Sequence, residues 1–200
     1  RGLVGSEMCI RDRATAMTRI VLVRHGQSTW NLEHRVQGQT MEVPLTRRGH
    51  RQAGEAGRKV AVLVPRHTAL LSSDQKRALQ TAQRVGCAIG STPQADARLR
   101  EQYLGDMEGK LSSELHEMPI PEDADIAEVG WGGGESLLDV WRRCRDLLDE
   151  LAENPPEAVV MVSHGDTLRV MLSALSGGTH RDCDYSLALT NGIVMYLSLI

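Results

Sequence analysis

The chain contains no phenylalanine, and aromatic residues make up only 3% of its 200 residues. Its hydrophobic core must therefore be built mainly from leucine, valine, isoleucine, alanine and methionine. The sequence also has no apolar stretch long enough to cross a membrane as a helix. The net charge is −3 and no basic stripe is visible, so we expect neither a membrane nor a nucleic acid as a partner.

The four cysteines lie far apart, and no two of them form a Cys-x-x-Cys pair. Such spacing argues against a structural metal site or a disulfide framework. We therefore expect free thiols, which are typical of a protein in the reducing cytoplasm. The cysteines are Cys9, Cys87, Cys144 and Cys183.

The length of the chain fits one domain of ordinary size. Residues 1–16 show no periodicity and lack the apolar segment of a secretion signal, so we expect them to be a non-native extension. A single domain is predicted over residues 17–200. Within it, residues 103–134 have little pattern and include Pro119 and Pro121, and they predict a cap-like insertion over the sheet.

Two apolar runs of the sequence end in similar tripeptides. Residues 20–23 precede Arg24-His25-Gly26, and residues 159–162 precede Ser163-His164-Gly165. Runs of this length and β-branched content are typical of buried parallel strands. Because ligands bind beyond the carboxyl ends of such strands, we expect His25 and His164 to face one another across one site.

Segments typical of strands and helices alternate along the chain. This alternation predicts a three-layer α/β/α sandwich, with a mostly parallel sheet and helices on both faces. A third strand at residues 69–71 leads to Ser72-Ser73-Asp74 and to Arg77 in the first turn of a helix. An arginine is unfavourable at that positive helix end unless an anion binds there. Two arginines and two histidines without metal-ligand spacing therefore predict a phosphate pocket.

Residues 22–31, LVRHGQSTWN, resemble the signature of the histidine phosphatase superfamily, phosphoglycerate mutase-like branch (branch 1). Further motifs of the chain are similar to that family's motifs and follow in the same order. The resemblance extends from about Thr18 to Leu199. The further motifs occupy residues 36–38, 44–49, 72–82, 99–101, 133–136 and 163–165.

The resemblance implies a phosphatase that hydrolyses small phosphomonoesters through a phosphohistidine, without a metal or other cofactor. His25 would be the nucleophile. Arg24, Arg77 and His164 would neutralise the phosphate oxygens. Glu101 would protonate the leaving oxygen and later activate water. The partner of such an enzyme is a small phosphorylated metabolite.

Some of these assignments have alternatives within the sequence. Asn31, Gln37 and Gly38 match positions that contact the phosphate, but Asn31 and Gln37 also suit ordinary turns. The acid segment contains two further carboxylates besides Glu101, and another acid follows His164. These competing donors are Asp106, Glu108 and Asp166.

Two other functions use the same motifs. A cofactor-dependent phosphoglycerate mutase would return the phosphoryl group to its substrate, but the segment after Glu101 lacks the long insertion and the His-Tyr-Gly run of those mutases. A catalytically silent phosphate-binding protein is disfavoured because every catalytic position is filled. The motifs define neither the organic part of the substrate nor the oligomeric state, for which a homodimer is one option.

Overall fold

The computed structural model describes residues 18–116, 120 and 122–198. The predicted extension at residues 1–16 lies outside the described residues. Five strands form one sheet in the order β3-β2-β4-β1-β5, and only β5 runs antiparallel to its neighbour. The strands are β1 (Arg19–Arg24), β2 (Ala69–Ser72), β3 (Gln94–Ala95), β4 (Ala158–Ser163) and β5 (Val194–Ser198).

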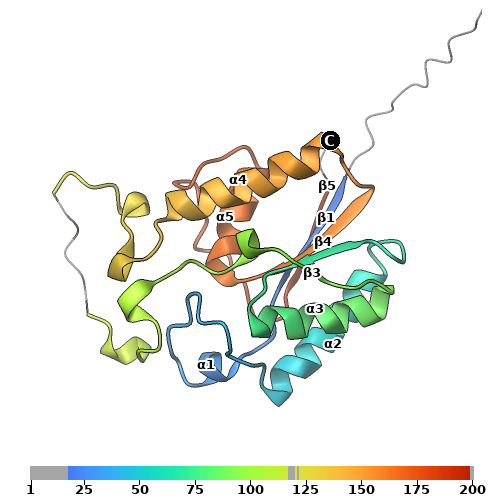
Figure 1. The fold of residues 1–200 in the computed structure, drawn as a ribbon, viewed down its shortest axis with the longest axis horizontal. Coiled ribbons are helices and arrows are strands. Elements are labelled where there is room, and N and C mark those ends of the chain that lie inside the picture. Colours follow the sequence, from blue (N-terminus) through green and yellow to red (C-terminus); the bar gives the residue numbers. More distant parts are fainter. Residues whose placement is uncertain (1–17, 117–119, 121, 199–200) are drawn as a thin grey trace, which may run out of the picture.

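Helices cover both faces of this sheet (Figure 1). α2 (Arg47–Ala61) and α3 (Lys76–Ile89) pack on one face, and α4 (Leu137–Glu153) and α5 (Gly165–Leu175) pack on the other. A single short turn, α1 (Thr29–Leu32), follows β1. The predicted three-layer α/β/α sandwich is confirmed. No helix in the described part of the chain is both long and apolar enough to cross a membrane.

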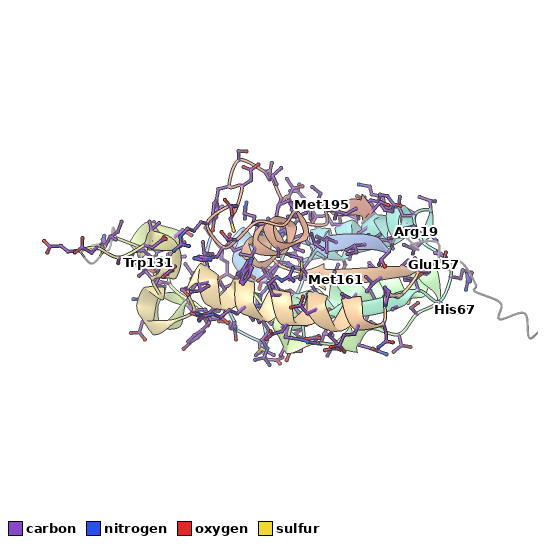
Figure 2. The ribbon with its side chains drawn as sticks, turned by 90° about the horizontal axis from the view of Figure 1, so that it is seen from above. Arg19, His67, Trp131, Glu157, Met161 and Met195 are labelled. Atoms are coloured by element: carbon purple, nitrogen blue, oxygen red, sulfur yellow. The ribbon has the colours of Figure 1, made fainter. Side chains whose placement is uncertain are left out.

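The core consists of two aliphatic layers, one on each side of the sheet. Ile20 and Leu22 of β1 face α4 and α5, whereas Val21 and Val23 face α2 and α3. Successive side chains of β1 are thus buried in turn on the two faces of the sheet. Both faces are covered, which explains why every residue in the middle of the strand is apolar. Met161 of β4 lies in the layer beneath α4 (Figure 2). The three described cysteines are free, as predicted, and Cys144 is fully buried in this layer.

Local signals in the sequence set most helix starts. Thr46 accepts a hydrogen bond from Gly49 N at the start of α2, and Ser136 and Asp139 form a reciprocal capping box at the start of α4. The last helix, α5, begins at Gly165, directly after His164. His164 occupies its N-cap position without a side-chain cap, so the usual capping signal is absent there.

Residues 103–134, named here the 103–134 segment, contain four short 3₁₀ turns in their described part. These turns are Gly105–Met107, Ser112–Glu114, Ile126–Glu128 and Trp131–Gly133, and a fifth, Ala97–Leu99, precedes the segment. The segment lies at the end of the molecule opposite the amino-terminal ends of β1 and β4. Figure 2 shows this arrangement, with Trp131 at one end and Arg19, His67 and Glu157 at the other.

The two ends of the 103–134 segment meet closely. Glu135 N donates a hydrogen bond to Tyr103 O over 2.8 Å. A Cβ atom on Gly105 would lie 1.8 Å from Gly132 O, and one on Gly134 would lie 2.0 Å from Tyr103 O. Glycine is therefore required for the two chain passages to touch, and the segment leaves and rejoins the domain at almost the same place.

A second close approach fixes α2 against the loop that follows β1. A Cβ atom on Gly26 would lie 2.3 Å from Gly49 O, and one on Gly49 would lie 2.1 Å from Gln27 O. Both neighbours are backbone atoms, which cannot move aside as a flexible side chain can. The residue after His25 and the first turn of α2 are therefore in direct backbone contact.

We predict that Gly49→Ala lowers the free energy of unfolding by about 1–3 kcal/mol, because the added methyl group overpacks this contact. Gly54→Ala in the same helix is the matched control. Its Cβ atom would meet only Arg58 Nη1, at 4.0 Å. It should raise stability by about 0.5–1 kcal/mol. Urea unfolding measures both, and equal midpoints for the two variants would contradict the packing constraint.

Candidate active site

The carboxyl ends of the two central strands bring His25 and His164 together. β1 and β4 pair in parallel with Arg24 opposite Ser163, so the residue after each strand projects at the same edge. Both imidazoles are almost completely buried. Their ring centroids lie 5.0 Å apart, with 59° between the planes. The structure therefore places the two histidines of the matching tripeptides side by side.

The surroundings of His25 define which ring nitrogen is free. Nδ1 lies 2.7 Å from Gly26 O, and a carbonyl oxygen only accepts hydrogen bonds, so Nδ1 carries the proton. Nε2 then holds a lone pair. Burial lowers the pKa of His25 well below its usual value, and the positive charges of Arg77 and Arg24 lower it further. His25 is consequently neutral at pH 7, the form in which imidazole is a nucleophile.

Two guanidinium groups lie beside the histidines, that of the buried Arg77 and that of the half-buried Arg24. Arg77 donates hydrogen bonds to Gly38 O over 2.8 Å and to Thr40 O over 2.9 Å, and Arg24 donates to Leu189 O. The Nε atom of each arginine is buried without a partner among the described residues. Burial lowers both pKa values, that of Arg77 to about 10, so both groups stay charged at pH 7. Buried positive charge with unused donors favours an anion.

His164 is held by Ser73, which follows β2. Its Nε2 atom lies 2.8 Å from Ser73 Oγ, and its Nδ1 atom is buried without a partner in the described part of the chain. Burial, followed by the charge of Arg77, lowers the pKa of His164 well below its usual value. His164 is thus neutral in this structure, and it would bear the charge expected from the sequence only with an anion beside it.

Asn31 and Gln37 are oriented by hydrogen bonds to their amide oxygens. Asn31 Oδ1 accepts from Ser28 N over 3.1 Å, within the capping box of α1, and from Asn191 Nδ2 over 3.2 Å. Gln37 Oε1 accepts from Ser28 Oγ over 2.6 Å. Asn31 therefore stabilises the local turn, which is one of the two roles that the sequence left open for it. With both oxygens engaged, the NH₂ groups are the part of each amide left to bind an anion.

Gly38 serves the site through its backbone. Its φ angle is +44°, and a Cβ atom there would lie 2.0 Å from Glu108 Oε1. Its carbonyl oxygen accepts hydrogen bonds from Arg77 and from Gln75 Nε2, the latter over 2.9 Å. Glycine adopts this left-handed φ angle without strain, and its carbonyl fixes the direction of the Arg77 side chain.

Among the candidate acids, Glu101 lies at the amino-terminal end of α5. Its carboxylate accepts from Thr167 N over 3.1 Å and from Asp166 N over 3.4 Å. It is also the carboxylate that acts most strongly on the pKa of both Arg24 and Arg77. These contacts favour Glu101 over its neighbours in the same segment as the acid of the site.

The other three acids have different surroundings. Glu108 accepts hydrogen bonds from Gln39 N and Leu104 N, so it stabilises the loop at Gly38. Asp106 is exposed. Asp166 pairs with Arg169 over 3.0 Å. Burial, followed by the charge of Glu101, raises the pKa of Asp166 to about 6, although 38% of its side chain is exposed. Asp166 therefore remains a second proton donor beside Glu101.

The sequence reasoning missed Asn191, which precedes β5. Its Nδ2 atom donates to His25 O and to Asn31 Oδ1, each over 3.2 Å. The backbone N–H of the next residue, Gly192, also donates to His25 O, over 3.1 Å. An Asn-Gly pair before a strand signals only a turn, so no pattern in the sequence links these residues to His25.

Within the described ranges, one cluster of side chains has ligand atoms close enough together to hold a metal ion. Ligand atoms of Asp125, Glu128 and His180 lie within 4.8 Å of one another. The guanidinium group of Arg181 binds both carboxylates, and His180 Nε2 lies 3.1 Å from Glu128. The cluster is thus an ion-pair network that joins the 103–134 segment to the loop after α5.

Comparisons with known proteins agree with this geometry. The histidine phosphatase superfamily (branch 1) matches residues 20–198. A glucosyl-3-phosphoglycerate phosphatase of Mycobacterium tuberculosis (strain CDC 1551 / Oshkosh) is 35% identical over 174 residues, or 78% of this chain and 74% of the relative. A probable phosphoglycerate mutase GpmB of Yersinia pestis (strain Pestoides F) is 35% identical over 170 residues, or 80% and 76%.

Solved structures show the same similarity. A mycobacterial glucosyl-3-phosphoglycerate phosphatase in complex with VO3 has a TM-score of 0.77 and 32% identity, and the match covers 90% of this chain and 92% of that chain. The fold places this protein among α/β enzymes whose reactive side chains follow parallel strands. Within that class, the chain belongs to the histidine phosphatase superfamily, branch 1. The family predicted from the sequence motifs is confirmed.

We predict that His25 and His164 both titrate well below pH 6.5 in the folded protein, as followed by NMR of the ring nitrogens. Arg77→Met removes a positive charge and should raise both pKa values. Arg84→Met, an exposed arginine of the same helix, is the control and should leave them unchanged. A wild-type midpoint at or above pH 6.5 would show that burial and the arginines do not keep the imidazoles neutral.

Proposed function

We propose that this protein hydrolyses small phosphomonoesters through a phosphohistidine formed on His25 Nε2. The observation that carries the proposal is the combination of a neutral imidazole with a free Nε2 atom and, beside it, two guanidinium groups whose buried Nε donors are unused among the described residues. The imidazole supplies the nucleophile, and the guanidinium groups supply a place for the phosphate. The family to which the chain belongs supports the same reaction.

In the first step, His25 Nε2 attacks phosphorus while the bond from phosphorus to the leaving oxygen breaks. The leaving oxygen keeps the electron pair of the broken bond, and Glu101 donates a proton to that oxygen, so an alcohol departs. Proton transfer matters because an alkoxide is a poor leaving group. The proton on His25 Nδ1 stays on that nitrogen and is donated in a hydrogen bond to Gly26 O, which holds the ring in one orientation.

In the second step, a water molecule attacks the phosphohistidine. Glu101, now a carboxylate, accepts a proton from the water, and the bond between phosphorus and Nε2 breaks. Inorganic phosphate leaves and neutral His25 is restored. Dividing one displacement into two lets the same carboxyl group act first as an acid and then as a base.

In both steps, the groups around the phosphate oxygens stabilise the negative charge of the transition state. Arg24 and Arg77 offer Nε donors, and His164 offers a further ring nitrogen. Asn31 and Gln37 would add their amide NH₂ groups. Negative charge that spreads over the equatorial oxygens in the transition state is stabilised strongly where water is excluded.

The substrate class follows from the phosphate group, and the organic part is open. Glucosyl-3-phosphoglycerate belongs in the first substrate panel because related phosphatases are named for it. Sugar phosphates, other phosphoglycerate derivatives, ribazole phosphate and nucleotides complete that panel, ranked by kcat/KM. The free thiols Cys87, Cys144 and Cys183 favour a reducing compartment, so we propose the cytoplasm as the location.

We predict that the purified protein hydrolyses p-nitrophenyl phosphate in the presence of EDTA, and that His25→Ala abolishes this activity by removing the nucleophile. His67→Asn is the matched control, since His67 lies near the far ends of the strands, opposite Trp131 (Figure 2). It should retain full activity, because asparagine also tolerates the positive φ angle at that position. Undiminished turnover by His25→Ala would refute the proposed nucleophile.

A phosphoglycerate mutase is the second candidate, favoured by the 35% identity to the probable mutase of Yersinia pestis. Both reactions begin with the same phosphohistidine and differ in the acceptor. We predict net release of phosphate from phosphomonoesters and little exchange between phosphoglycerates. Rapid exchange that is stimulated by the bisphosphate, with little free phosphate, would instead identify a mutase. Binding of phosphate esters without any turnover would identify a silent binding protein.

A further inference from the structure

We propose that Arg143, clamped by Glu135, is a positioning residue that places the proton donor Glu101 through its backbone carbonyl. The inference rests on the proposed role of Glu101. It also assigns a role to the motif at residues 133–136, which contains Glu135. That motif matches the family, but none of its residues is among the proposed phosphate ligands.

Arg143 of α4 uses all three guanidinium nitrogens. Nε and Nη2 donate to the two carboxylate oxygens of Glu135 over 3.0 and 3.1 Å, which is a bidentate pair. Nη1 donates to Arg98 O over 2.6 Å, and Nη2 also donates to Glu101 O over 3.1 Å. The side chains of Arg143 and Glu135 are only 14% and 22% exposed. This pair is therefore better shielded from solvent than an ordinary surface ion pair.

Glu101 depends on such contacts because no helix or strand contains it. It follows the 3₁₀ turn Ala97–Leu99 and lies in an irregular stretch. Its N–H donates to Gln75 Oε1 over 2.8 Å, and its carbonyl accepts from Arg143 and from Gln39 Nε2, the latter over 3.1 Å. Side chains alone thus fix both ends of the Glu101 residue.

Glu135 connects this support to the phosphate-binding loop. Its Oε2 atom accepts from Gln39 Nε2 over 3.1 Å as well as from Arg143. Gln39 directly follows Gly38, whose carbonyl receives the Arg77 hydrogen bond. The distance between the acid and the bound phosphoryl group is therefore set by one connected network. Loss of Arg143 would remove one of the two hydrogen bonds to the Glu101 carbonyl and let the acid shift, while the histidines and arginines stay in place.

This role predicts an effect that depends on the leaving group. Phenolate is a more basic leaving group than p-nitrophenolate and needs the proton of Glu101 more. Phenyl phosphate and p-nitrophenyl phosphate have nearly the same shape. Their ratio of kcat/KM contains only the steps up to departure of the leaving group, so it reports on proton donation. A residue that positions the acid must affect phenyl phosphate more.

The test compares Arg143→Met with Arg142→Met, a matched control whose arginine is adjacent in sequence, 63% exposed and paired with Asp139 in the described part of the chain. We expect Arg143→Met to lower kcat/KM for phenyl phosphate by up to about 100-fold, the cost of a displaced catalytic group. The loss of kcat/KM for p-nitrophenyl phosphate should be much smaller, and Arg142→Met should match wild type on both substrates. Equal losses on the two substrates would overturn the proposal.

A double mutant separates this inference from the proposed function. If Arg143 acts through Glu101, adding Arg143→Met to Glu101→Gln should cause no further loss on phenyl phosphate, whereas independent effects would multiply. Full multiplication overturns the positioning role and leaves the role of Glu101 intact. If Glu101→Gln loses no more activity on phenyl phosphate than on p-nitrophenyl phosphate, Glu101 is not the acid. That result would refute the positioning role of Arg143 as well.

Glu135→Gln tests the same clamp if Arg143→Met lowers the yield of folded protein. Glutamine keeps the shape of glutamate but removes the charge of the bidentate pair, so it should shift the substrate ratio in the same direction. Arg143→Lys keeps the charge but not the planar fork, and it should restore only part of the activity on phenyl phosphate. Wild-type ratios in both variants would contradict the clamp.

Discussion

In the centre of the sheet, β1 pairs with β4 in parallel, and Arg24 stands opposite Ser163. Every contact between the two histidines depends on this register. A slip of one residue would turn the side chains of either strand to the opposite face. The register is enforced by burial, because alternate residues of β1 enter two different apolar layers. The same pattern that builds the core therefore aligns the reactive groups at its edge.

A buried charge is usually paired with an opposite charge, but in the described part of the chain the arginines of this site are not. Among the described residues, the buried ends of Arg24 and Arg77 bond to backbone carbonyls rather than to carboxylates. Burial, followed by the positive charge of these arginines, keeps His25 and His164 neutral. A phosphate dianion bound beside the arginines would supply the negative charge that their backbone partners do not. If His25 is the nucleophile, as proposed, one arrangement both prepares it and favours its substrate, and it would couple anion binding to the stability of the fold.

The sequence was most informative where a local signal decided the structure. The apolar runs predicted β1 and β4, and residues 69–71 predicted β2. Contacts between distant segments were beyond such reasoning. Asn191 bonds to a residue 166 positions away, and no periodicity encodes that pairing. The catalytic roles of the site residues remain predictions, although the structure gathers their side chains around the same strand ends.

The narrow neck of the 103–134 segment, where Glu135 N meets Tyr103 O, brings both ends of the segment to one place in the domain. Between these ends the segment has further contacts with the domain, because Glu108 accepts a hydrogen bond from Gln39 N and Arg181 pairs with Asp125 and Glu128. Because the entropy cost of lengthening a closed loop grows slowly with its length, residues could be added between these contacts at little cost in stability. The length of the segment could thus vary without moving the strand ends that position His25 and His164.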